Sequence, residues 1–292
     1  VLKGLVYYFY DIYWYNISYA HYNIKNVGGL TMKRNLFKVM ALVVAICLVA
    51  FVMTACQGTT TPVGSEKKVL VMGTNAEFPP FEFITEKGLV DKFDGIDVAI
   101  AKAIADDLGM ELKIENMEFD SIIPSLNTGK IDIGIAGMSV TEDRLENVDF
   151  TQTYYVATQV MIVKKDSGIT KAEDLEGKKV GVVTGYTGDL LVSDMNIAKS
   201  IDRYKKCLDA VIELNNGKID AVVIDSAPAA AMLKNYPDLI IVTDEKFETE
   251  EYAMAVKKGN TELLEKVNAS LKKMLDSGKI SEISEKYLQE IE

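Results

Sequence analysis

Histidine and cysteine are scarce in this sequence, and their scarcity excludes several kinds of chemistry. The chain has 1 histidine and 3 cysteines among 292 residues. The histidine, His21, lies in an unusual first segment, so the rest has no imidazole for a Ser-His-Asp triad, a Cys-His pair or a zinc site. Cys47 and Cys56 lie near the start, which leaves Cys207 alone in the remainder and allows no disulfide there. We expect Cys207 to be a small packing residue, and we expect neither a metal nor a cofactor.

Positive charge is also in deficit. The chain has 32 Lys and Arg residues against 43 Asp and Glu residues, a formal net charge of −11. Phosphate backbones and anionic lipid surfaces repel such a protein, so we expect no nucleic-acid partner. The length and a hydrophobic content of 48% are enough for two modest domains or one large one.

One uninterrupted apolar run covers residues 39–52. It is too short to span a bilayer, for which about 20 residues are needed. Basic residues within 33–38 precede it, and small residues followed by Cys56 end it, a pattern typical of an export signal. The alternative is an ordinary signal peptide with an incidental cysteine.

The small residues before Cys56 resemble the lipobox of bacterial lipoproteins. This resemblance implies that residues 32–56 are a signal peptide and that Cys56 is lipidated and anchors the mature chain outside the cytoplasm. Residues 57–66 are then a flexible tether. Residues 1–31 are rich in tyrosine and have no clear period, so we expect a misplaced gene start upstream of Met32.

Strand and helix patterns alternate from residue 67 onward, which predicts an α/β fold with parallel sheets flanked by helices. The predicted strands are residues 69–74, 112–114, 131–136, 179–183 and 219–224, and residues 252–256 are strand-like. The predicted helices are residues 97–108, 121–127, 208–215, 228–235, 261–277 and 281–289.

An internal echo indicates two lobes of similar build. The segment LNTGKID at residues 126–132 matches LNNGKID at 214–220, each a helix end with a glycine followed by a strand. Any α/β protein can reuse this turn, so the echo alone leaves other arrangements open. We assign residues 67–162 and 253–292 to lobe 1 and residues 163–252 to lobe 2, with crossings near 159–165 and 251–257. The last two helices then pack on lobe 1.

A ligand of such a fold is expected beyond the carboxyl ends of the strands. Ser139 and Asp225 follow predicted strands there, and Arg144 lies three residues after Thr141, a good helix N-cap. A free amino acid needs a guanidinium and helix-start amides for its carboxylate, and an acid and hydroxyls for its ammonium. Taken alone, Arg144 would more often be a solvated surface residue.

Aromatic residues could wall such a site. The loop at residues 75–83 follows a strand and is rich in phenylalanine and proline, although core packing is the favoured role for Phe81 and Phe83. Phe119 follows another strand and is a candidate second wall.

Six segments resemble the polar-amino-acid family of ABC-transporter substrate-binding proteins, family 3 of the bacterial solute-binding proteins. They are GTNAEFPPFEF (73–83), FDGIDVAIAKAIADDLG (93–109), FDSIIPSLNTGKIDIGIAGMSVTEDR (119–144), VDFTQTYY (148–155), GKKVGVVTGYTG (177–188) and GKIDAVVIDSAP (217–228). The resemblance implies a two-lobed periplasmic-binding-protein-like fold of type II, each lobe a mixed sheet flanked by helices, joined by two hinge strands. It implies a monomer outside the cytoplasm that captures a free L-amino acid and delivers it to an ABC transporter permease.

The resemblance also implies a role for individual residues. Arg144 matches the residue that clamps the ligand carboxylate, with help from Ser139 and from Thr187 at a helix start. Asp225 matches the acid that pairs with the ammonium, beside Ser139 and the carbonyl of Gly137.

Phe78 and Phe119 match the aromatic pair that sandwiches the ligand side chain. Two positions depart from the family pattern. Asn75 stands where members that bind cations generally have aspartate, and Val183 stands where many have a polar residue. These departures favour a polar uncharged or small ligand over a basic one, although Glu77 would restore a negative charge if it faced the site.

Two other functions stay open at this point. Cyclohexadienyl dehydratases resemble these binding proteins, and Glu77 and Glu82 are the acids that such an enzyme would use. The sensor domain of a signalling receptor is the third reading. We favour a binding protein over an enzyme, and the sequence leaves the bound amino acid, the permease and the type of cell envelope undetermined.

Overall fold

The computed structural model describes residues 68–289, which belong to one compact unit, Glu66–Glu292. The predicted leader, the signal peptide with Cys56 and the tether lie outside the described residues, and they stay predictions. No helix within residues 68–289 is long and apolar enough to cross a membrane.

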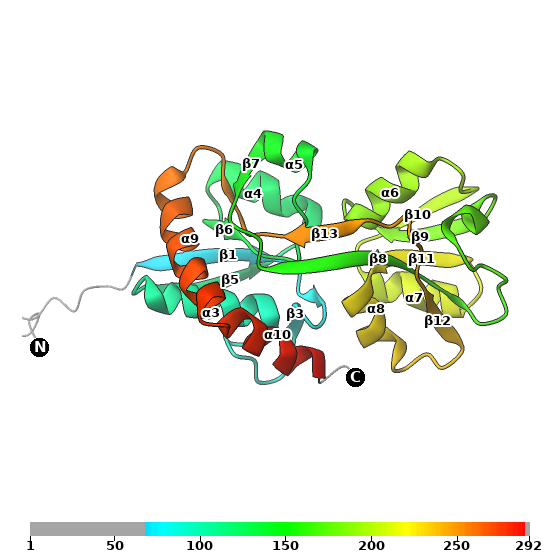
Figure 1. Cartoon of the computed structure of the whole chain (residues 1–292), viewed down its shortest axis with the longest axis horizontal. Helices are drawn as coiled ribbons and strands as arrows, with labels where there is room; N and C mark the ends of the chain where they lie inside the picture. The colour runs from blue at the N-terminus through cyan, green and yellow to red at the C-terminus, as the bar shows by residue number, and fades with distance from the viewer. Residues whose placement is uncertain (1–67, 290–292) are drawn as a thin grey trace, which may run out of the picture. The chain divides into compact units, whose positions relative to one another are not determined.

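Lobe 1 is built on a five-stranded mixed sheet with the order β5-β1-β6-β14-β7 (Figure 1). Its strands are β1 (Val69–Thr74), β5 (Glu111–Asn116), β6 (Ile133–Gly134), β7 (Val148–Phe150) and β14 (Ala255–Lys257). The strand β1 runs parallel to β5 and β6, whereas β14 runs antiparallel to β6 and β7. A small sheet of β2 (Glu77–Phe78), β3 (Glu82–Ile84) and β4 (Phe93–Asp94) lies beside it.

The helices of lobe 1 bury apolar faces that recur every three or four residues. In α3 (Ile96–Asp107), Ile96, Ile100 and Ile104 are fully buried, as the helical period predicts. The other helices are α4 (Ile122–Thr128), α5 (Glu142–Asn147), α9 (Thr261–Asp276) and α10 (Lys279–Gln289). The two last helices pack against α3 and against each other (Figure 1).

Lobe 2 has its own mixed sheet, in the order β10-β9-β11-β8-β12. Its strands are β8 (Tyr155–Lys164), β9 (Lys179–Val183), β10 (Ser200–Tyr204), β11 (Ala221–Asp225) and β12 (Leu239–Val242). Its α-helices are α6 (Thr187–Met195), α7 (Cys207–Asn215) and α8 (Ser226–Leu233). Successive residues of β8 enter different hydrophobic clusters, Val160 and Ile162 on one face and Met161 and Val163 on the other. Both faces of this sheet are therefore covered, which explains the apolar run along β8.

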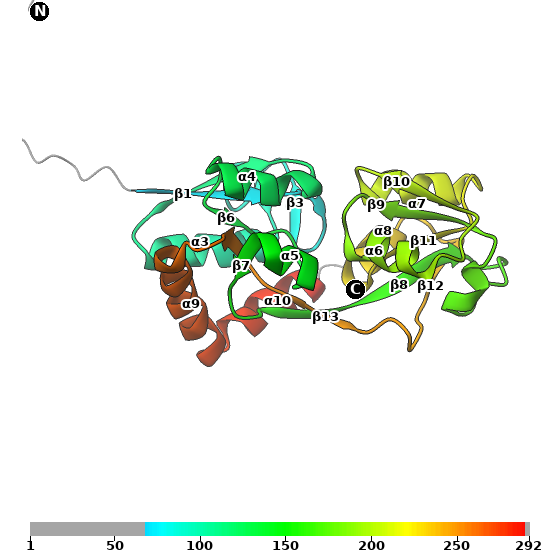
Figure 2. The ribbon, with the colours of Figure 1, turned by 90° about the horizontal axis from the view of Figure 1, so that it is seen from above.

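Two antiparallel strands join the lobes. The first part of β8 pairs with β13 (Thr249–Tyr252), from Thr158 opposite Thr249 to Tyr155 opposite Tyr252. Both views show these two strands running together between the lobes (Figures 1 and 2). The predicted two-lobed α/β fold with mixed sheets is confirmed.

Three details of the prediction from local patterns were wrong. The sheets are mixed and not wholly parallel, because β14 and β8 return antiparallel to their neighbours. The strand-like stretch 252–256 is the end of β13 and the start of β14, since Ala253 and Met254 pass between two sheets. The predicted strand at residues 131–136 keeps regular pairing only in β6, because the chain then turns toward the left-handed Gly137.

Candidate functional site

The carboxyl ends of the strands bring the selected polar residues toward one region. Asp225 ends β11 and is 3% exposed, and Ser139 follows β6 and is 2% exposed. Gly137 has φ +53°, and a Cβ there would lie 2.6 Å from a ring carbon of Phe78. Only glycine fits both this backbone conformation and this close approach.

Arg144 is buried and lies at the boundary between the lobes. Thr141 caps α5 as predicted, its Oγ1 accepting the backbone N–H of Arg144 at 3.3 Å. The guanidinium donates from Nη1 to the carbonyl oxygen of Ser139 (2.7 Å) and from Nη2 to that of Gly185 in lobe 2 (3.0 Å). The central carbon of the guanidinium, Cζ, lies 5.1 Å from the ring centre of Phe119. The default surface role for Arg144 is therefore wrong, because only 7% of it is exposed.

The charge of Arg144 has no carboxylate within ion-pair distance among residues 68–289, and its hydrogen bonds go to carbonyl oxygens. Burial lowers the pKa of Arg144, and the negative charges of Glu250 and Asp225 act in the opposite direction. Arginine stays protonated even so. A buried cation whose hydrogen bonds go to carbonyl groups, without a carboxylate partner, is suited to receive an anion.

Asp225 is an acid whose environment disfavours its charge. Burial, and then the negative charge of Glu250, raise the pKa of Asp225 from 3.8 to about 7. Hydrogen bonds from Tyr252 and Gln159 act in the opposite direction, and the hydroxyl of Tyr252 donates to Oδ1 at 2.6 Å. An incoming ammonium group would restore the ionised form.

Three aromatic rings meet at the predicted side-chain site. The ring of Tyr186, from lobe 2, stands edge-on to Phe78 at 5.3 Å and to Phe119 at 4.6 Å between centroids. Its hydroxyl donates to Oδ1 of Asn75 at 2.8 Å, while the amide of Asn75 donates to the carbonyl of Met117 at 2.9 Å. The sequence reasoning missed Tyr186, although a large aromatic residue in a glycine-flanked loop at a strand end was a usable signal.

Thr187 begins α6, as predicted, so its backbone N–H points out of the helix start. Its hydroxyl accepts from Nε2 of Gln159 at 3.1 Å and donates to Oε2 of Glu250 at 2.7 Å. The hydroxyl of Ser139 donates to the same oxygen at 2.5 Å. Glu250 was also missed, because a run of acids in an acidic protein reads as surface.

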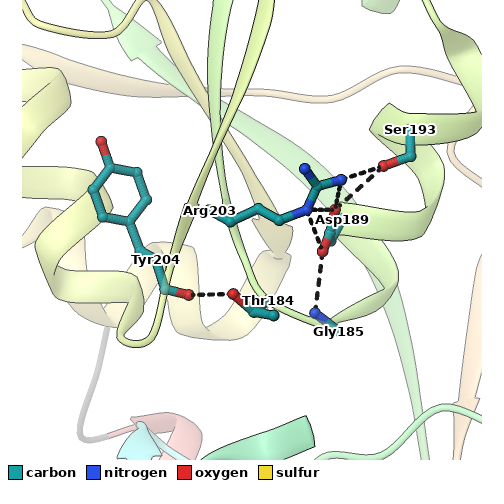
Figure 3. A network of polar contacts seen from close by, with 6 residues as sticks. All are labelled: Thr184, Gly185, Asp189, Ser193, Arg203 and Tyr204. Atoms are coloured by element: carbon teal, nitrogen blue, oxygen red, sulfur yellow. Dashed lines mark hydrogen bonds and ion pairs between the residues drawn. The ribbon is translucent and has the colours of Figure 1, made fainter.

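The loop that carries Tyr186 and Thr187 is braced by an ion pair (Figure 3). Asp189, in the first turn of α6, accepts the backbone N–H of Gly185 at 3.1 Å and Nε of Arg203 at 2.9 Å. The hydroxyl of Thr184 donates to the carbonyl of Tyr204 on β10 at 3.2 Å (Figure 3). The backbone of this loop is therefore fixed to the sheet of lobe 2.

A cavity of about 800 Å³ opens beside these groups. Of the residues selected from the sequence, Ser139 and Thr187 line it, together with Gln159 and Glu250. Its further carboxylates are Glu142, Asp143, Asp194, Glu248 and Glu251, with Lys246 as the basic residue. Such an acidic lining attracts cations. Within the part of the chain that the structure describes, no group of three His, Cys, Asp or Glu residues could hold a metal ion.

Two buried acids, Asp97 and Glu82, lie next to the site. Asp97 accepts the backbone N–H of Gly137 (2.8 Å) and the hydroxyl of Tyr154 (2.9 Å) on one oxygen. Burial raises the pKa of Asp97 to about 6, and burial together with Asp97 raises that of Glu82 well above its usual value. Glu82 is fully buried and Glu77 pairs with Lys206 at 2.6 Å, so neither acid nominated for an enzyme lines the cavity.

The remaining selected residues serve packing. Phe81 is fully buried and Phe83 packs against Tyr287, as the sequence favoured. Val183 is buried, and Cys207 is a buried free thiol whose pKa burial raises.

The chain resembles known proteins over most of its length. Residues 70–290 match the profile of the bacterial extracellular solute-binding proteins, family 3. A probable histidine-binding protein of Neisseria gonorrhoeae is 38% identical over 252 residues, 83% of this chain and 93% of that one. An arginine-binding extracellular protein of Bacillus subtilis (strain 168) is 35% identical over 255 residues, 86% of this chain and 97% of that one.

Solved structures agree with these matches. A mutant of ArgBP from T. maritima has a TM-score of 0.70 and 44% identity, covering 76% of this chain and 95% of that chain. An ancestral arginine-binding protein bound to arginine has a TM-score of 0.70 and 43% identity, covering 76% and 99%. A related structure, bound to glutamine, has a TM-score of 0.69 and 42% identity, covering 76% and 98%. Nearly the whole of the arginine-bound ancestral chain (99%) matches 76% of this chain, in which Glu66–Glu292 is one compact unit. With its two lobes, mixed sheets and connecting strands, the chain belongs to the family 3 bacterial extracellular solute-binding proteins and has the type II periplasmic-binding-protein fold.

Proposed function

We propose that this protein captures a free amino acid between its lobes and delivers it to an ABC importer. The observation that carries the proposal is the pair Arg144 and Asp225, contributed by different lobes. Both side chains are buried, the negative charge of Asp225 acts on Arg144, and within residues 68–289 the two form no ion pair. Two opposite charges held apart in this way are suited to the two ends of one zwitterion.

The neighbouring groups complete this assignment. Arg144 and the start of α6 at Thr187, with help from Ser139, would hold the carboxylate. Asp225, with Ser139 and the carbonyl of Gly137, would hold the ammonium. Phe78, Phe119 and Asn75 would surround the side chain. These residues stay proposed, and what supports them is their burial around one region and the cavity beside it.

The ligand class that we propose is a polar amino acid. Relatives are named for histidine and arginine, and ancestral arginine-binding proteins were solved with arginine and with glutamine. Asn75 offers a neutral amide to the end of the side chain, while the acidic cavity favours the approach of a cation. A thermal-shift screen of the twenty amino acids against the unit Glu66–Glu292 would identify the ligand.

The test of the proposal is calorimetry with that ligand. Arg144→Ala or Asp225→Ala leaves one charge of the ligand without its partner, so each should cost about 3 kcal/mol or more. Arg144→Lys keeps the charge but loses the paired donors of guanidinium, and it should fall between wild type and Arg144→Ala. Near-native affinity in both alanine variants, with intact thermal unfolding, would refute the assignment.

We also propose that the mature protein is a monomer held outside the cytoplasm by a lipid on Cys56. The support is the lipobox-like sequence and the extracellular character of the family. Labelling of cells with a radioactive fatty acid should mark the wild type and not Cys56→Ser. Equal labelling of the two would rule out this anchor.

A further inference from the structure

The places assigned to a ligand are filled by side chains of the protein itself. We propose that Tyr186 and Glu250 act as an internal ligand, closing the lobes without an amino acid and having to leave before one binds. This inference rests on the proposed function. It assigns Tyr186 and Glu250 a role in setting the affinity of the site and in selecting which ligand side chains can enter.

Tyr186 takes the position of a ligand side chain. Its ring comes from lobe 2, is 7% exposed, and lies against Phe78 and Phe119 of lobe 1. Its hydroxyl uses Oδ1 of Asn75, the polar group at the end of the predicted site. A second side chain cannot occupy this space while the ring is there, because close-packed interiors leave no room for both.

Glu250 takes the hydroxyl groups that a ligand carboxylate would need. Its Oε2 accepts from Ser139 of lobe 1 at 2.5 Å and from Thr187 of lobe 2 at 2.7 Å. Each hydroxyl has one proton to donate, so neither can donate to a second carboxylate at the same time. The negative charge of Glu250 also acts on Arg144, where the ligand carboxylate is expected.

These contacts hold the two lobes together. Two polar bridges run from one lobe to the other. One is the hydrogen bond from Tyr186 to Asn75, and the other is Glu250, which accepts hydrogen bonds from Ser139 and Thr187. The bond from Arg144 to the carbonyl of Gly185 is another. They are of the same kind as the contacts expected from an amino acid, so the ligand gains only the difference between the two sets.

The consequence for affinity follows from population arithmetic. If the self-closed form, defined by the Tyr186 and Glu250 contacts, holds about nine molecules in ten, the apparent affinity is about tenfold below that of the open form. Removing either contact should then tighten binding. If Tyr186 or Glu250 instead contacts the bound ligand, removing it should weaken binding.

The experiment uses the unit Glu66–Glu292, stripped of copurified ligand by unfolding and refolding. Small-angle X-ray scattering gives the radius of gyration without ligand, and calorimetry gives the affinity for arginine, histidine and glutamine. The variants are Tyr186→Ala, Tyr186→Phe and Glu250→Gln. Tyr236→Ala, in another part of lobe 2, and Glu245→Gln, an exposed acid in the segment before β13, are the matched controls.

We expect the ligand-free wild type and both controls to be compact, and Tyr186→Ala and Glu250→Gln to have a larger radius of gyration. Affinity should rise about tenfold in these two variants and about threefold in Tyr186→Phe, which loses only one hydrogen bond. If Tyr186→Ala does not fold, Glu250→Gln and Tyr186→Phe carry the test.

An extended ligand-free wild type, or unchanged or weaker binding in the variants, would overturn the inference. If no protein binds any of the three amino acids, the thermal-shift screen tests the proposed function, while the scattering of the ligand-free proteins still tests self-closure. The two failures are therefore distinguishable.

Discussion

Binding of the amino acid should release a proton, because Asp225 is partly protonated when the site is empty. Burial, and next the charge of Glu250, raise its pKa from 3.8 to about 7. At pH 6 about nine in ten molecules then carry this proton. The ligand ammonium needs the ionised carboxylate, and a cation in contact lowers the pKa of an acid by about 1–3 units. The release at pH 6 should therefore be about 0.4 to 0.9 proton per ligand, larger for a larger shift, and about half a proton at pH 7.

The same linkage sets the pH dependence of affinity. The free protein binds the extra proton, so low pH favours the free form, and affinity should fall about fivefold to tenfold from pH 8 to pH 6. The charged or titratable groups that interact with Asp225 are Glu250 and Tyr252 from β13 and Arg144 from α5. The charge of Asp225 also acts on the buried or half-buried Glu82, Tyr155, Tyr186 and Cys207. No histidine follows His21, so an ordinary imidazole cannot produce the effect.

The assay is calorimetry at pH 6 in phosphate and in imidazole buffer, whose ionisation enthalpies differ. Glutamine is the best probe if it binds, because its side chain does not titrate, and arginine is the alternative. The difference in heat between the buffers gives the number of protons released. Asp225→Asn should bind more weakly, with no buffer dependence. Equal heats for the wild type in both buffers would show that Asp225 does not exchange its proton for the ligand ammonium.

Two further predictions concern the support beneath the site. Asp97→Asn can keep the bonds from Gly137 and Tyr154, and it should raise the free energy of unfolding at pH 7 by about 3 kcal/mol, since the pKa of Asp97 is raised from 3.8 to about 6. Because the pKa of Asp97 is higher in the folded state, its protonated form stabilises the wild type below pH 4, and this stabilisation is lost as pH rises through 6. Urea unfolding at pH 4 should therefore show no gain of Asp97→Asn over the wild type. Gly137→Ala should cost about 2 kcal/mol or more, because it combines φ +53° with a methyl group 2.6 Å from the ring of Phe78. Urea unfolding measures this loss, and an unchanged midpoint would show that the turn tolerates a side chain.

The local pattern of the sequence was enough for most of the fold. Strands β1 and β9 have the predicted bounds, because runs of apolar residues between turn signals mark buried strands. The errors arose where a strand is defined by its partner and not by its own residues. Ala253 and Met254 are fully buried and apolar, yet they lie between β13 and β14 because the chain passes there from one sheet to another.

The candidate site divides in the same way. The helix cap at Thr141 and the strand end at Asp225 are local signals, and they are sufficient to predict Arg144 in the first turn of a helix and Asp225 at the end of a strand. The direction of the guanidinium was not predictable, since it depends on the carbonyl of Gly185 from the other lobe.

Tyr186 and Glu250 show why part of the site lies beyond sequence reasoning. Each is unremarkable within its own element, one a residue before a helix and the other an acid on a short strand. Their contacts arise only where the lobes meet. There the ring of Tyr186 lies against Phe78 and Phe119, and Glu250 accepts hydrogen bonds from two hydroxyl groups. The affinity of a site between two lobes depends on the difference in free energy between the closed form with ligand and the closed form without it. Under the self-closure that we propose, residues that compete with the ligand also contribute to its affinity, and no local pattern distinguishes them from residues that hold it.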